Sequence, residues 1–245
     1  MSGEMRGESK TAPEGAVGPD RSGGVQHHVT PQEPRLETPV RTRTAVLIDG
    51  FNLYHGMRER FGRRYLWLDL HRMASLIRPR DEIVRVSYYT ALVENDPEGR
   101  GRQETYLAAL AAHSGPELEI VLGRFQRKSQ KCRACGAAWA SHEEKETDVN
   151  IAIGLVTAAA SRAVDLALLV TADSDLCPAI RAARSIAPVM GMIAAFPPKR
   201  SSFEIRSLVP GALMIGPDKL RRSLLPEIVV DAAAGKEHHR PKKWQ

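Results

Sequence analysis

Aspartates follow apolar segments at several points of this 245-residue sequence. Asp49 comes after the apolar run TAVLI at residues 44–48, and Asp173 and Asp175 come after LALLV at residues 166–170. Asp148 opens a helical pattern over residues 148–161. Taken singly, Asp148 would be an ordinary acid in the first turn of a helix, and Asp175 an ordinary N-cap. Together, carboxylates at the carboxyl ends of parallel strands predict a site at one edge of a sheet.

Such a cluster predicts a divalent cation. Two carboxylates about 4 Å apart repel each other by roughly 4 kcal/mol at an effective dielectric near 20, and a bound cation removes this repulsion. Oxygen ligands favour Mg²⁺ or Mn²⁺. We expect Asp49 and Asp173 to ligate the principal ion, and Asp148 and Asp175 to ligate it directly or through water. A cation held in this way promotes phosphoryl chemistry by stabilising negative charge.

Short apolar runs alternate with helical patterns across the middle of the chain. Strands are predicted at residues 44–48, 83–89, 118–125, 166–171 and 189–196, with an edge strand at 212–215. Helices are predicted at 69–77, 98–113, 148–161 and 176–187, and a short one after Pro217. This alternation is typical of the α/β class. We therefore expect a three-layer α/β/α fold, Rossmann-like, with a central, mostly parallel sheet.

The two ends differ in composition from residues 41–231, which we take as one domain. Residues 1–40 contain few large aliphatic side chains and predict a disordered arm, and residues 232–245 predict a basic tail. The net charge of +6 weakly favours phosphate-rich partners. No apolar stretch approaches the roughly 20 residues of a membrane span, and the first residues contain no secretion signal. We expect a cytoplasmic protein that has no membrane partner.

A cysteine pair lies in a loop insertion at about residues 129–143. Cys132 and Cys135 form a C-x-x-C, which is half of a tetrahedral zinc site, and His142 follows as a candidate third ligand. No second pair follows, so the sequence does not choose a fourth ligand. Two free thiols in a surface loop are the alternative interpretation. Cys177, within a helical pattern, is expected to be a small core residue.

Several other kinds of site have signature motifs that this chain lacks. The chain contains no G-x-G-x-x-G, no P-loop and no G-x-S-x-G, so dinucleotide, P-loop and serine-hydrolase chemistry lack their signatures. Basic residues Lys199 and Arg200 follow the fifth predicted strand and are expected to bind substrate. Tyr54 and His55 follow the first aspartate, where stacking on a base and core packing are both open.

Three ordered segments carry a family resemblance. VLIDGFNLYHG (46–56), HEEKETDVNIAIGL (142–155) and LLVTADSDLCPAI (168–180) resemble the signature blocks of the NYN domain, most closely its LabA-like branch in the PIN-like ribonuclease superfamily. The resemblance implies an acidic metal site, a polar residue that orients it, and rim hydroxyls that bind phosphate or water. The residues in these roles would be Asp49, Asp148, Asp173 and Asp175 for the metal, Asn52 for orientation, and Thr171 and Ser174 at the rim.

The same resemblance implies a function. We expect a metal-dependent endoribonuclease that uses Mg²⁺ or Mn²⁺ to hydrolyse RNA, with structural Zn²⁺ at the cysteine loop left open. Two alternatives are a non-catalytic regulatory module that binds RNA or protein, and a phosphoesterase acting on small phosphoesters. RNA is the expected partner, and the sequence leaves a homodimer or a protein partner open.

Overall fold

The computed structural model describes residues 41–131 and 134–245, and for residues 125–131 and 139–144 it describes the backbone alone. The arm predicted at residues 1–40 lies outside this range. Within the described ranges, no helix has both the length and the apolar character that crossing a membrane requires.

Six parallel strands form the central sheet, in the order β3-β2-β1-β6-β7-β8. The chain builds outward from β1 to β3, then returns to place β6 on the other side of β1 and continues to β8. Ligands bind such sheets outside the carboxyl ends of the strands where this direction reverses, here β1 and β6. The strands are β1 (Arg43–Asp49), β2 (Glu82–Thr90), β3 (Leu118–Leu122), β6 (Leu166–Val170), β7 (Gly191–Phe196) and β8 (Leu213–Met214).

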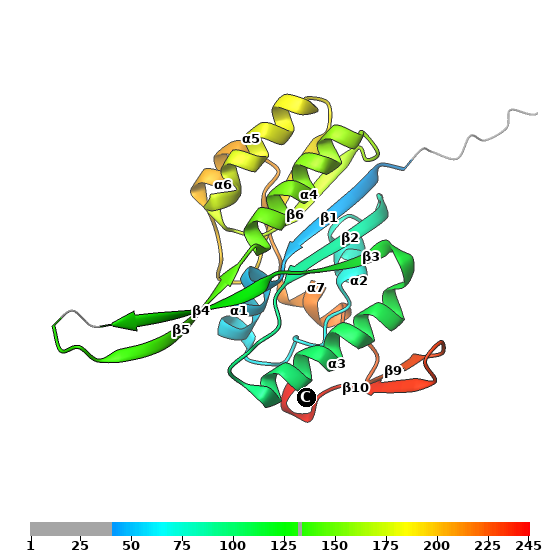
Figure 1. Ribbon diagram of the computed structural model, residues 1–245. Helices are drawn as coiled ribbons and strands as arrows, with labels where there is room; N and C mark the ends of the chain where they lie inside the picture. Colours follow the sequence, from blue (N-terminus) through cyan, green and yellow to red (C-terminus); the bar gives the residue numbers. More distant parts are fainter. Residues whose placement is uncertain (1–40, 132–133) are drawn as a thin grey trace, which may run out of the picture. The chain divides into compact units, whose positions relative to one another are not determined.

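Helices cover both faces of the sheet, which confirms the predicted three-layer α/β/α architecture (Figure 1). Successive residues of β1 point to opposite faces, so Ile48 belongs to one hydrophobic core and Leu47 to the other. On the Ile48 face lie α1 (Gly50–Phe61), α2 (Leu70–Ile77), α3 (Pro97–Ser114) and α7 (Pro217–Arg222). On the Leu47 face lie α4 (Thr147–Ser161), α5 (Cys177–Ile186) and α6 (Phe203–Leu208).

Helix α1 was not among the predicted helices. It begins at Gly50, because the Asp49 carboxylate accepts the backbone N–H of Asn52 and caps the helix. A Cβ at Gly50 would lie 2.5 Å from the carbonyl oxygen of Tyr89, so only glycine lets α1 start this close to β2. Leu53 and Met57, one turn apart, are then buried against the sheet.

The strand predicted at residues 118–125 ends early. Gly123 separates β3 from β4 (Arg124–Lys131), and its backbone N–H donates to the carbonyl oxygen of Thr90. Strand β4 pairs antiparallel with β5 (Ala138–Lys145) in a separate hairpin (Figure 1). The predicted insertion at 129–143 is therefore the distal part of this hairpin, which runs directly into α4.

The prediction of a free basic tail from residue 232 is wrong. Strands β9 (Ile228–Asp231) and β10 (Lys236–His239) form a hairpin, and the chain ends in the 3-10 helix Lys242–Trp244. Trp244 is only 7% exposed, because its ring packs against Trp67 and Tyr106. A large aromatic side chain thus holds the basic end of the chain on the domain.

Candidate metal site and its neighbouring pocket

Three carboxylates meet at the edge of the sheet where β1 and β6 end. Asp49 ends β1, Asp148 lies in the first turn of α4, and Asp173 follows β6. Each offers one oxygen, and these oxygens all lie within 4.8 Å of one another. The predicted fourth member, Asp175, is exposed and lies outside this group. Its backbone N–H instead donates to Asp173 Oδ1 at 3.0 Å within the 3-10 turn Ser174–Leu176.

Hydrogen bonds hold the Asp49 carboxylate in one orientation. Its Oδ1 accepts from the backbone N–H of Asn52 and its Oδ2 from the hydroxyl of Thr171, both at 2.9 Å. The same Thr171 oxygen accepts the backbone N–H of Asp173 at 3.0 Å, so one hydroxyl links two carboxylate-bearing segments. Thr171 is only 1% exposed, and our expectation that it lies at the substrate rim is wrong. It positions the aspartates.

Burial, together with the smaller effect of the negative charges of Asp148 and Asp173, raises the pKa of Asp49 to about 6. The hydrogen bonds from Asn52 and Thr171 oppose this rise because they stabilise the ionised carboxylate. A nearby cation would favour ionisation of the whole group. Three carboxylate oxygens suit a hard divalent ion, so the residues present can bind a metal such as Mg²⁺ or Mn²⁺.

The other predicted site residues lie around this cluster in different roles. The Asn52 side-chain oxygen accepts the backbone N–H of Ala172 at 3.1 Å, which ties α1 to the loop after β6 and agrees with an orienting role. Ser174 is exposed at the start of its 3-10 turn, and its substrate role stays a prediction.

An open pocket of about 260 Å³ contains the cluster. Besides the three aspartates it is lined by Phe51, Asn52, His55 and Arg200. A guanidinium nitrogen of Arg200 donates to a carboxylate oxygen of Glu59 at 3.0 Å, which directs this cation beside the acidic group. Lys199 lies 3.7 Å from Glu59 and is outside the lining, so of the two predicted basic residues Arg200 is the one placed at the site.

Backbone strain occurs on both sides of the acidic pocket. Glu146, just before the helix that carries Asp148, has φ 79°, and Lys199, just before Arg200, has φ 58°. They are two of the three non-glycine residues with positive φ in the described ranges. Residues held in this region cost on the order of 1–3 kcal/mol and cluster at functional sites. The strain is a local signal, independent of charge, for the same site.

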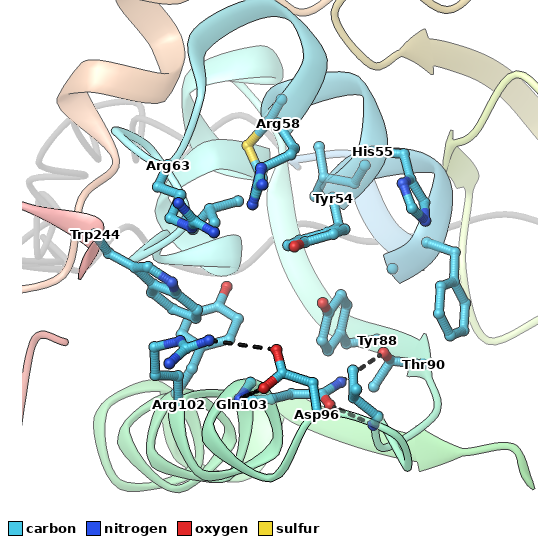
Figure 2. A pocket seen from close by; sticks show the side chains of 18 residues that line it. Tyr54, His55, Arg58, Arg63, Tyr88, Thr90, Asp96, Arg102, Gln103 and Trp244 are labelled. Carbon is cyan, nitrogen blue, oxygen red and sulfur yellow. Dashed lines mark hydrogen bonds and ion pairs between the residues drawn. The ribbon is translucent and has the colours of Figure 1, made fainter. Parts of the chain in front are cut away.

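A second pocket, of about 350 Å³, lies between α1, β2 and α3 (Figure 2). It shares Phe51 and His55 with the acidic pocket. The sequence singled out Tyr54 and His55 but not this pocket, because its lining comes from residues that lie as far apart as Gly50 and Trp244. Burial lowers the pKa of His55, and the positive charges of Arg200 and Arg58 lower it further.

The zinc site stays a prediction. Cys132 lies outside the described residues, and His142 is described only as a backbone position of β5, opposite residue 127. Cys135 is an exposed free thiol. Cys177 is buried in α5, as expected for a core residue.

Comparison with known proteins identifies a family over most of the domain. The family model for the NYN domain matches residues 43–207 of this chain. The 6-hydroxy-3-succinoylpyridine 3-monooxygenase HspA of Pseudomonas putida is 28% identical over 182 residues, which cover 60% of this chain. The match covers 56% of that relative, about half of its length. A solved structure of a protein of unknown function from Vibrio parahaemolyticus has a TM-score of 0.48 and 19% identity, covering 78% of this chain and 100% of that one.

Proposed function

Because this chain belongs to the NYN domain family, we propose that it is a metal-dependent endoribonuclease that hydrolyses RNA phosphodiester bonds. The observation that carries the proposal is the group of three carboxylate oxygens within 4.8 Å at the carboxyl edge of the sheet. The family's general nuclease character supports it, and RNA is the substrate that the family implies.

The roles of the residues follow from their placement. Asp49, Asp148 and Asp173 would hold Mg²⁺ or Mn²⁺, which when bound supplies Lewis-acid stabilisation of phosphoryl transfer. Thr171 fixes the orientation of Asp49 through the hydrogen bond described above. Arg200 places a positive charge in the same pocket, where it can bind a phosphate oxygen of the RNA.

The test measures cleavage of labelled single-stranded RNA with Mn²⁺ or Mg²⁺. We expect Asp49→Asn to reduce the rate on the order of 10²–10³-fold and EDTA to abolish cleavage. The matched control is Asp165→Asn, because Asp165 precedes β6 at the opposite edge of the sheet and pairs with Arg43 at 3.0 Å. The Asp165→Asn variant should cleave RNA at the wild-type rate. RNA cleavage that survives both Asp49→Asn and EDTA would contradict the proposal.

Two other outcomes would favour the alternatives. Metal binding without cleavage of any RNA, at any metal concentration, would indicate a regulatory NYN module that binds RNA or protein. Turnover of a small phosphodiester such as bis(4-nitrophenyl) phosphate, without RNA cleavage, would indicate a phosphoesterase.

The likeness to a pyridine monooxygenase supports a second candidate function, the hydroxylation of a heteroaromatic acid. The second pocket combines aromatic rings with arginines, which suits a ring that carries a carboxylate. Such a reaction needs O₂ and a reductant. Oxygen uptake with NADH and 6-hydroxy-3-succinoylpyridine would support this candidate, and its absence under conditions where RNA is cleaved would eliminate it.

A further inference from the structure

We propose that the pocket between α1, β2 and α3 binds one nucleotide, with the base among its aromatic rings and the phosphate on Arg58 and Arg63. The source of this nucleotide is a residue of an RNA chain or a free mononucleotide. Where the source is RNA, the inference rests on the proposed ribonuclease function.

The size and the rings of the pocket suit a base. Its volume of about 350 Å³ lies at the lower end of the roughly 300–1,000 Å³ of small-molecule pockets, which suits one nucleotide and excludes a duplex. Tyr54 is 37% exposed and lies opposite the buried Tyr88 (Figure 2). At the other end, Trp244 and Tyr106 pack edge to face at 5.8 Å. Bases of any sequence can stack on such rings, because every base has a π-face.

The charges in the pocket suit a phosphate. Its lining holds three arginines and one aspartate, a net charge of +2 with His55 neutral. Arg102 is already paired, with Asp96 at 3.5 Å and Glu98 at 3.3 Å. Among the described residues, neither Arg58 nor Arg63 forms an ion pair, and both side chains extend toward the pocket (Figure 2). Arginine binds phosphate through two parallel hydrogen bonds, so two uncommitted guanidinium groups favour a phosphorylated ligand.

The position of the pocket links it to the acidic site. Phe51 and His55, one turn apart on α1, line both pockets, and their rings stack at 6.4 Å with 20° between the planes. A nucleotide in the second pocket therefore lies one side-chain layer from the three carboxylates. An RNA chain that continues past these two rings would bring its next phosphodiester to the metal site.

The experiment measures binding with EDTA present, so that no cleavage is needed to score it. The probes are adenosine 5′-monophosphate, inorganic phosphate and a fluorescein-labelled hexauridylate. Arg58→Gln combined with Arg63→Gln should weaken mononucleotide binding by about tenfold or more, as expected when hydrogen bonds to a charged group are lost. Tyr54→Ala should weaken it by about tenfold through lost stacking. The matched control is Arg60→Gln, since Arg60 lies on the same helix over Phe61, outside the pocket lining.

Three results would support the inference, and two of them would also assign the source of the nucleotide. Weakened binding of both the mononucleotide and the hexamer supports a nucleotide site open to either source. A higher KM for RNA in the double variant, with kcat unchanged, assigns the site to RNA. An effect on adenosine 5′-monophosphate alone assigns it to free nucleotides.

Other results would overturn it. No saturable binding of any nucleotide probe, equal affinities for inorganic phosphate and the mononucleotide, or equal effects of the arginine pair and Arg60→Gln would each refute the inference, even if RNA is cleaved. The Asp49→Asn variant separates the two proposals. If wild type and Asp49→Asn both bind nucleotide and neither cleaves RNA, the ribonuclease function is refuted and the nucleotide site is supported.

Discussion

In the metal-free protein, the buried carboxylate of Asp49 is expected to contribute less to stability at neutral pH than at pH 4. Its pKa in the folded protein is about 6, against an ordinary value of 3.8. Since the folded state binds this proton more tightly than the unfolded chain does, Asp49 contributes stability at low pH. That contribution is lost as the pH rises from about 4 to about 6. The difference between the two pKa values corresponds to about 3 kcal/mol.

The substitution Asp49→Asn removes the charge and keeps the shape of the side chain. Like the protonated carboxyl, the amide has one acceptor oxygen and one donor group, and the pKa of about 6 already includes the hydrogen bonds from Asn52 and Thr171 to the ionised form. We therefore expect the free energy of unfolding of the variant to exceed that of wild type by about 3 kcal/mol at pH 8. At pH 4, where Asp49 is protonated in the folded state, the two proteins should differ by less than about 1 kcal/mol.

Urea unfolding from pH 4 to pH 8 in EDTA, followed by circular dichroism, measures this difference. Asp165→Asn is a control whose effect on stability should change with pH in the opposite direction, because hydrogen bonds from Arg43 hold the pKa of Asp165 below its usual range. The stability from Asp165 is present above its unfolded pKa and lost as the pH falls, so its variant should be the less stable one at pH 8. A difference between wild type and Asp49→Asn that does not change with pH would refute the reasoning.

Two further substitutions test how the site is built. Thr171→Val removes the donor to Asp49 and the acceptor for the Asp173 N–H, so it should lower stability by about 1–3 kcal/mol and Mn²⁺ affinity by about 10–100-fold in calorimetry. Unchanged affinity would show that the hydroxyl does not position the carboxylates. Gly50→Ala should destabilise by about 1–3 kcal/mol in urea unfolding, because its Cβ would meet the Tyr89 carbonyl at 2.5 Å. A Cβ at Gly101 in α3 would have no other atom within 4 Å, so Gly101→Ala should stabilise the protein by about 1 kcal/mol. Equal effects of Gly50→Ala and Gly101→Ala on stability would contradict the argument.

The sheet could be predicted from the sequence because its signal is local. Residues 166–170 are all buried, as a continuous apolar run requires when helices cover both faces of a parallel sheet. Helix α1 gave no such signal. Its buried positions are Gly50, Leu53, Gly56 and Met57, two of them glycines, and its remaining residues are largely polar or aromatic. Hydrophobic periodicity does not detect a helix whose buried face is made partly of glycine.

The packing of residues 232–245 could not be predicted from the sequence for a different reason. The segment from residue 232 has the composition of a solvated tail, and one tryptophan among basic residues carries no periodic pattern. Only the folded domain provides the neighbours, Trp67 and Tyr106, against which Trp244 packs. Tertiary packing therefore determines this segment, which local propensity alone assigns to solvent.

The aspartate cluster could be predicted because strand ends in a parallel sheet converge whatever the side chains are. The individual roles of Asp175 and Thr171 depend on details within a turn. Asp173 and Asp175 are equivalent by spacing, yet in the 3-10 turn the first accepts the N–H of the second, and only the first joins the cluster. The family resemblance implied that Thr171 lies at the rim, where a hydroxyl would bind phosphate or water. Its burial follows from packing against Asp49, which no sequence pattern encodes.

Helix α1 connects these observations, since it presents different faces to the core, the carboxylates and the second pocket. Its N-terminal residue Gly50 permits the close approach to β2, and Phe51 and His55 then separate the two pockets. Asp49 precedes the helix and Arg58 lies two turns along it, so metal binding and the proposed phosphate binding depend on opposite ends of one rigid element. Substitutions at these two ends should therefore change separate quantities, the rate of cleavage at Asp49 and the affinity for nucleotide at Arg58. If Arg58→Gln lowered kcat as much as Asp49→Asn does, with KM unchanged, the two pockets would have to be one catalytic site.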